Sequence, residues 1–406
     1  MRWVGLAMVA SLLVTGAGRL NAQHQGGLER PATPRIELRE VTRVGGWDER
    51  PGYALEQVTA GLIRADGTFV VADQGARQVR FYSAVGNLMA AVGRDGDGPG
   101  EFRSIQSMGL LRDGSVAVWD FASTRLTILG PDGEVGPTIR IRDPELTSLY
   151  ATFVGVFPDT SVVMRADVHA YALRDEPAGL RRDSVRLRVY GPDGVARSPV
   201  LKVPGPERLL YRVDRSWGTE ELLFSREVTS AATSSELLVA SGDSLVIRRY
   251  GPSGSPRPAW MAPYEPVQPT AEDIAAEREK RRTAARRTAE ARASSSLPFA
   301  TSTETQLRQE LERVEALDAY PSFPAFRALV VADGQTVWVE DAAWGKGAVS
   351  HWHQLDSDLS AVTMFELPAA QGLLAIGAGR VLVLERGEFE VESVVLYRLE
   401  EADSGR

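Results

Sequence analysis

Cysteine is absent from this chain of 406 residues, and histidine, lysine and asparagine are scarce. Without cysteine the chain has no disulfide, no lipid-modified cysteine, no thiolate metal ligand and no thiol nucleophile. Only four histidines occur, and Asn87 is the one asparagine beyond residue 22. No serine nucleophile elbow, HExxH zinc motif or phosphate-binding glycine loop is present either. The sequence therefore carries none of the common catalytic signatures.

Residues 1–22 are predicted to be a secretory signal peptide. Arg2 precedes an apolar run over residues 4–14, and Ala22 supplies a small residue at the cleavage point. The run is too short to cross a bilayer comfortably, although an uncleaved N-terminal anchor is the alternative. We therefore expect an exported protein, periplasmic or extracellular, with no membrane span after cleavage.

Acidic residues outnumber basic ones. Loss of Arg2 and Arg19 with the leader leaves 44 basic and 54 acidic residues, a formal charge of −10. This balance argues against nucleic acid or an anionic membrane surface as the main partner.

A repeated pattern organises residues 23–400. A β-rich run ends in tyrosine or leucine before a turn, and this occurs six times, with the markers Tyr82, Leu129, Tyr190, Tyr250, Leu355 and Tyr397. Asp-Gly pairs such as Asp66-Gly67 and Asp113-Gly114 precede further β-branched runs, as tight hairpin turns require. The pattern predicts an all-β fold, a six-bladed β-propeller. We expect residues 36–41 to close the ring beside residues 393–399, because an open ring would expose sheet edges.

The longest interval between markers contains a helical insertion, residues 270–318, between the fourth and fifth repeats. Thr270 and Asp273 form a capping-box pattern, and Glu277 lies four residues before Arg281. A second helix follows, with Thr301 as its predicted cap. The insertion is either a helical hairpin packed on the propeller or an arm that contacts a partner.

Residues 93–102 resemble the GxGPGxF connector of NHL-type six-bladed propellers, and residues 320–339 look like the fifth blade of secreted bacterial propellers of this kind. The resemblance implies the fold and leaves the activity open, because such propellers include scaffolds, ligand binders, lyases and lactonases. We expect Phe102 to insert between two blades.

The same connector contains Asp95, Asp97 and Glu101, whose oxygens could hold calcium. The remaining ligands of an EF-hand are missing, and a structural turn is the alternative. Calcium is the one cofactor that the sequence suggests; otherwise we expect none.

His351 and His353 are the only closely spaced histidine pair. Alternation along a strand places both rings on one face, so they could share a zinc ion with a third ligand such as His169. Packing between blades is the alternative.

Asp73, Asp120 and Glu340 end comparable predicted strands and could meet at one end of the central channel. Six-bladed lactonases hold a metal there with Glu, Asp and Asn, and related lyases use histidines. The scarcity of asparagine and histidine in this chain departs from both patterns. Trp217 and Trp344, on predicted loops, are candidates for ligand contact.

Two functions follow from these observations. The first is a non-catalytic binding propeller that recognises a protein, peptide or carbohydrate. The second is a metal-dependent hydrolase or lactonase with carboxylate ligands at the pore.

Overall fold

The structure, a computed structural model, describes residues 33–48, 50, 52–144, 150–167, 173, 175–213, 216–293, 303–341, 349–368 and 370–401. The predicted signal peptide lies outside these residues. No helix within them is long and apolar enough to cross a membrane.

The described residues form six antiparallel sheets, numbered here in chain order, and two helices. The first sheet contains β2 (Val58–Ile63), β3 (Phe69–Asp73), β4 (Gln78–Tyr82) and β5 (Leu88–Val92). The second contains β6 (Ile105–Leu110), β7 (Val116–Asp120), β8 (Arg125–Leu129) and β9 (Val135–Arg140). The third has five strands, β10 (Tyr150–Val156), β11 (Val162–Asp167), β12 (Gly179–Tyr190), β13 (Leu201–Val213) and β14 (Ser216–Glu221).

The remaining sheets follow the same order. The fourth contains β15 (Val228–Ala232), β16 (Leu237–Ser241), β17 (Val246–Tyr250) and β18 (Pro256–Met261). The fifth contains β19 (Phe326–Ala332), β20 (Thr336–Asp341), β21 (Val349–Leu355) and β22 (Ala361–Pro368). The sixth contains β23 (Gly372–Gly377), β24 (Arg380–Arg386), β25 (Glu392–Glu401) and β1 (Ile36–Gly45); a short 3-10 turn (Glu388–Glu390) precedes β25. All six marker residues of the sequence pattern lie on the third strand of their sheet.

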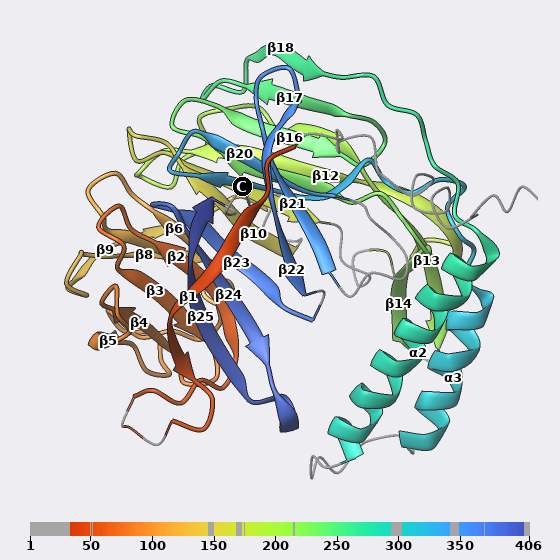
Figure 1. The fold of residues 1–406 in the computed structure, drawn as a ribbon, viewed down its shortest axis with the longest axis horizontal. Helices are drawn as coiled ribbons and strands as arrows, with labels where there is room; N and C mark the ends of the chain where they lie inside the picture. Colours follow the sequence, from red (N-terminus) through yellow and green to blue (C-terminus); the bar gives the residue numbers. More distant parts are fainter. Residues whose placement is uncertain are drawn as a thin grey trace, which may run out of the picture.

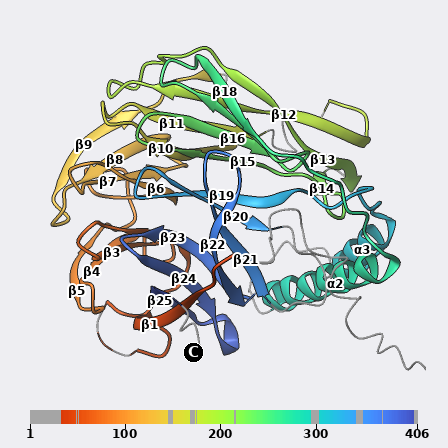
Figure 2. The same ribbon diagram turned by 45° about the horizontal axis from the view of Figure 1, so that its top comes forward.

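The first strands of successive sheets form a closed ring. Each contacts the next in the order β2, β6, β10, β15, β19, β23 and back to β2. Figure 1 shows the sheets arranged around this ring, and Figure 2 shows the same arrangement from a tilted direction. Sheets placed radially around a central ring of strands define a β-propeller, so the predicted propeller fold is confirmed.

The two ends of the chain meet in the sixth sheet (Figure 1). Strand β1 pairs antiparallel with β25 from Ile36 opposite Glu401 to Gly45 opposite Ser393. The predicted closure by residues 36–41 is confirmed, and the pairing is longer than expected. It satisfies the outer edge of β25, which would otherwise be an exposed template for another strand.

Apolar side chains fill the spaces between neighbouring sheets. Phe102, the last residue of the connector, is fully buried among Val79 and Phe81 of the first sheet and Ile105 of the second. This confirms the expected insertion of Phe102. Because both faces of each sheet are covered, the second strands are largely apolar, and every residue of β3 is buried, including Asp73 at its end.

The insertion forms two helices, α2 (Ala271–Ala293) and α3 (Thr303–Ala316), as predicted. Thr270 and Asp273 form the expected capping box, in which the Asp273 N–H donates to Thr270 Oγ1 and the Thr270 N–H donates to Asp273 Oδ2. Glu277 and Arg281 form the expected ion pair at 3.2 Å. The predicted cap Thr301 lies outside the described residues.

The helices dock beside β13 and β14, the long outer strands of the third sheet (Figures 1 and 2). Arg281 of α2 donates to the carbonyl oxygens of Glu221 and Leu222 at 2.7 and 3.1 Å. The Arg313 guanidinium of α3 lies 4.6 Å from the centre of the Tyr211 ring. Leu317, just beyond α3, is buried in an apolar cluster with Leu223, Phe224 and Phe323. The hairpin is therefore packed on the propeller by polar and apolar contacts together.

Candidate functional site

The strand register tests whether Asp73, Asp120 and Glu340 occupy equivalent positions in their sheets. Asp73 lies opposite Val58 and Asp120 opposite Ile105, at the start of the inner strand of each sheet. In the fifth sheet the residue opposite the start of the inner strand is Asp341, which faces Phe326. The assignment of Glu340 to this set is therefore wrong, because neighbouring residues on a strand point to opposite faces.

Asp73 and Asp120 are fully buried and bind groups of the protein itself. Asp73 accepts hydrogen bonds from the backbone N–H groups of Gln57 and Ala76 and forms an ion pair with Arg80 at 3.0 Å. Asp120 accepts from Ser104 N–H at 2.9 Å and lies 3.8 Å from Arg125. These carboxylates join the inner strand to its neighbour.

The two histidines face different carboxylates. His353 is fully buried, with Nε2 3.6 Å from Asp341 Oδ2, and His351 Nε2 lies 3.6 Å from Glu366. Their rings are 6.5 Å apart, centre to centre. The alternation of side chains does place His351 and His353 on one side of β21. Each ring, however, lies beside a different carboxylate, Glu366 for His351 and Asp341 for His353. His169 lies outside the described residues.

The connector carboxylates are paired with arginine. Asp95 and Asp97 lie 3.4 and 2.8 Å from Arg103, and Glu101 lies 2.6 Å from Arg94. The hydrogen bond from Arg103 is the main reason that the pKa of Asp97 is lowered. Bonds to the Gly98 N–H and to Arg94 lower the pKa of Glu101 in the same way. These pairs fit the structural turn rather than a calcium site, and no group of three His, Asp or Glu residues suited to a metal occurs in the described ranges.

Two glutamates near one end of the ring have raised pKa values. Burial is the largest cause for both Glu227, just before β15, and Glu340, at the end of β20. Both are influenced by Arg327 of β19, whose Nη1 lies 3.8 Å from Glu340 Oε1. Glu227 belongs to no recognisable sequence pattern and was not among the predicted site residues.

Of the two candidate tryptophans, Trp217 has a described backbone position and Trp344 does not. Trp217 lies in strand β14, opposite Arg212, and not on a loop as expected. The long β13–β14 hairpin that contains it replaces the predicted loop. Trp344 lies outside the described residues.

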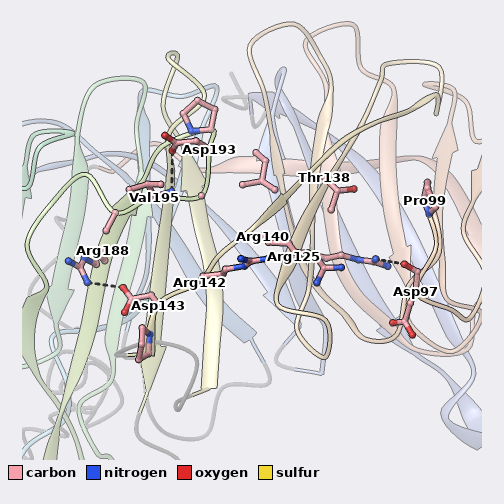
Figure 3. Close-up of a pocket in the computed structure, with 15 residues that line it drawn as sticks. Asp97, Pro99, Arg125, Thr138, Arg140, Arg142, Asp143, Arg188, Asp193 and Val195 are labelled. Atoms are coloured by element: carbon pink, nitrogen blue, oxygen red, sulfur yellow. Dashed lines mark hydrogen bonds and ion pairs between the residues drawn. The ribbon is translucent and has the colours of Figure 1, made fainter.

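An open pocket of about 970 Å³ lies between the second and third sheets (Figure 3). It is bounded by the connector, by the end of β9 with the segment after it, and by the turn between β12 and β13. Its lining residues are Asp97, Pro99, Arg125, Thr138, Ile139, Arg140, Arg142, Asp143, Pro144, Arg188, Pro192, Asp193, Gly194, Val195 and Ala196. Of these, only Asp97 was among the residues singled out from the sequence.

Two of the four pocket arginines are held by the protein. Arg125 is buried and donates to the carbonyl oxygens of Asp97 and Glu101 at 2.6 and 2.7 Å. Arg188 donates to Asp143 at 2.8 Å. Figure 3 shows Arg125, Arg140 and Arg142 together in the middle of the pocket, between Asp97 on one side and Asp143 on the other.

The turn between β12 and β13 closes against β9 through a glycine. Gly194 has φ +75°, and a Cβ atom there would lie 2.2 Å from the carbonyl oxygen of Arg140. Only glycine satisfies both the backbone conformation and this close approach. Gly194 therefore sets the distance between the two walls of the pocket.

No protein-family profile matches the chain, and no curated protein matches it. Among solved structures, it is similar to a member of the DUF4221 family from Bacteroides vulgatus, with 10% identity, a TM-score of 0.44, and coverage of 91% of this chain and 100% of that chain. A virginiamycin B lyase from Staphylococcus aureus gives 10% identity, a TM-score of 0.40, and coverage of 90% and 100%. A gluconolactonase from Xanthomonas campestris gives 13% identity, a TM-score of 0.41, and coverage of 91% and 98%. The fold assigned above rests on the ring of sheets itself.

Proposed function

We propose that this chain is an exported, six-bladed, NHL-type propeller that acts as a binding module without catalytic activity. Each of the six sheets corresponds to one blade, and the connector at residues 93–102 resembles the link between NHL blades. Residues 1–22 would direct export as a signal peptide.

The composition of the pocket carries this proposal. Its described lining residues offer guanidinium groups, prolines and a threonine, and none of them is a Ser, Cys, Lys or Tyr nucleophile. Its aspartates are engaged: Asp97 by Arg103, Asp143 by Arg188, and Asp193 by the N–H of Val195 in its own turn. The described side chains of this site can hold and orient a ligand, and none of them is placed to attack one.

The hydrolase alternative has one supporting observation. Burial raises the pKa of both Glu227 and Glu340, and both are influenced by Arg327, so either is a candidate general acid. This alternative requires a metal or another water-activating group beside one of these carboxylates.

Elemental analysis of the purified mature chain, with melting curves in calcium, zinc and EDTA, tests the two functions. A metal that binds only the folded state stabilises it by about 2.7 kcal/mol at a hundredfold excess over Kd. The binding proposal expects melting curves unchanged by EDTA and no hydrolysis of lactones or esters. One metal per chain, together with lactone turnover that Glu340→Gln abolishes, would overturn it.

A further inference from the structure

Among the described residues, Arg140 and Arg142 differ from the other arginines of the pocket in having no ion-pair or hydrogen-bond partner for their side chains. Neither forms an ion pair or a side-chain hydrogen bond with any described residue, and both are exposed. Arg140 is near enough to Asp97 to contribute to the lowering of its pKa, behind the larger effect of Arg103, yet it makes no ion pair with it. In a chain with a net charge of −8, two adjacent uncompensated guanidinium groups mark a locally positive site.

The backbone holds these two side chains in a defined arrangement. Arg140 is the last residue of β9, and Ile141 continues the pairing because its N–H donates to the carbonyl oxygen of Thr124 at 3.2 Å. Ile141 is buried in the core between the second and third sheets. Since side chains alternate along an extended chain, Arg140 and Arg142 lie on the side opposite Ile141. Both guanidinium groups therefore face the pocket from a fixed strand end.

The rest of the pocket suits an extended chain better than a compact anion. Pro99, Pro144 and Pro192 line it, and the side chain of Val195 is 61% exposed. The prolines and Val195 therefore offer rigid apolar contacts at several places along the open pocket. A volume of about 970 Å³ can hold several residues of a peptide.

We infer that this pocket binds an extended acidic peptide segment of a partner protein, with two carboxylates on Arg140 and Arg142. The planar guanidinium matches a carboxylate with two parallel hydrogen bonds, and the prolines and Val195 contact the intervening residues. This inference rests on the proposed binding function and adds the chemistry of the ligand.

Fluorescence anisotropy with a labelled glutamate-rich peptide, and with a matched glutamine-rich peptide, tests the inference on the mature chain. The double variant R140Q/R142Q should bind the glutamate-rich peptide on the order of tenfold more weakly than the unmodified protein. The matched control R39Q/R308Q removes two exposed positive charges elsewhere, 75% and 70% exposed, and should bind as the unmodified protein does. Both variants should melt normally, because none of the four side chains is buried.

Three outcomes would overturn the inference. An equal loss of affinity for the glutamate-rich peptide in R140Q/R142Q and in R39Q/R308Q would mean that the peptide responds only to net charge. If the glutamine-rich peptide bound as tightly as the glutamate-rich peptide, the carboxylates would not be what the pocket recognises. Displacement of the peptide by equimolar pyrophosphate would identify a phosphate site instead. None of these three results contradicts the proposed binding function. Metal-dependent turnover in the elemental and activity measurements would contradict the binding function, so failure of the two proposals can be told apart.

Discussion

Arg80 and His353 occupy the same position in two different sheets. Arg80 pairs in register with Val71, two residues before Asp73, and His353 pairs with Val339, two residues before Asp341. Each points at the buried carboxylate that ends the second strand, at 3.0 Å for Arg80 and 3.6 Å for His353. The same arrangement, a basic residue type on the third strand facing an acid on the second, therefore occurs in both the first and the fifth sheet.

Replacement of Arg80 should destabilise the fold strongly. Arg80→Ala leaves Asp73 buried without its counter-charge, and it also frees the carbonyl oxygens of Gly52 and Ala54 that Arg80 binds. We expect a loss of about 3–5 kcal/mol in the free energy of unfolding, measured by urea denaturation. Arg39→Ala, at an exposed ion pair, is the control and should cost well under 1 kcal/mol, as is usual for surface pairs. Similar values for both variants would contradict a structural role for the pair.

His353 should be more sensitive to replacement than His351. His353→Ala leaves a cavity and an unpartnered Asp341 in the core, and the expected cost is about 2–4 kcal/mol. His351→Ala removes a partly exposed side chain beside Glu366 and should cost under about 1 kcal/mol. Thermal melts of both variants, with and without zinc, distinguish a packing role of these histidines from a role as zinc ligands. A zinc-dependent stabilisation that either variant abolishes would restore the shared metal site.

The pH dependence of stability should have opposite signs at Glu340 and Glu236. Burial raises the pKa of Glu340, so the folded state favours its neutral form and loses stability as the pH rises through that pKa. Bonds from Arg249 and then Arg257 lower the pKa of Glu236, so its contribution is present at neutral pH and is lost as the pH falls through the lowered pKa.

Glutamine variants of Glu340 and Glu236 measure the sign of each residue's contribution to the free energy of unfolding. At pH 7, Glu340→Gln should raise the free energy of unfolding and Glu236→Gln should lower it. Both differences should shrink as the pH is lowered past the ordinary glutamate value of about 4.3. Glu312→Gln, on the exposed side of α3, is the control with no expected effect. Denaturation at several pH values gives the result, and differences of the same sign would disprove the assignment.

Gly194→Ala should disturb both stability and the pocket. The added methyl group meets the carbonyl oxygen of Arg140 at 2.2 Å and also strains a backbone with φ +75°. Gly379→Ala is a matched control, because φ is +65° and nothing lies within 4 Å of the added Cβ. We expect a cost of about 1–2 kcal/mol for Gly379→Ala and a larger cost for Gly194→Ala. Only Gly194→Ala should also weaken binding of the glutamate-rich peptide. Equal costs in urea denaturation would show that the turn can move away from β9.

Arg281 should fix the helical hairpin to the third sheet. Arg281→Ala removes the two hydrogen bonds to the carbonyl oxygens of Glu221 and Leu222. Amide hydrogen exchange in α2 should become faster, with the remaining sheets unaffected. Arg286→Ala, which removes only a contact to Glu279, is the control. Unchanged exchange in both variants would mean that the apolar cluster around Leu317 holds the hairpin alone.

Much of the fold was readable from the sequence because its determinants are local. Asp-Gly pairs specify tight turns, with Gly67 at φ +81° and Gly114 at φ +84°, and β-branched runs specify the strands between them. The capping box at Thr270 predicts where α2 begins, since its hydrogen bonds span only three residues. Repetition of the pattern then implies that the units stack around a ring, and closure follows because exposed edges are unfavourable.

The tertiary structure decided the rest, because side chains distant in sequence meet only after the sheets are paired. The choice between Glu340 and Asp341 depends on the register with β19, and a shift of one residue reverses the face of the sheet. The arginine pocket brings together the connector, the end of β9 and the turn at Gly194, and composition alone does not indicate such a meeting. The sequence determined the units and their order, and the packing of those units determined which charges were neutralised inside the blades and which were left facing solvent.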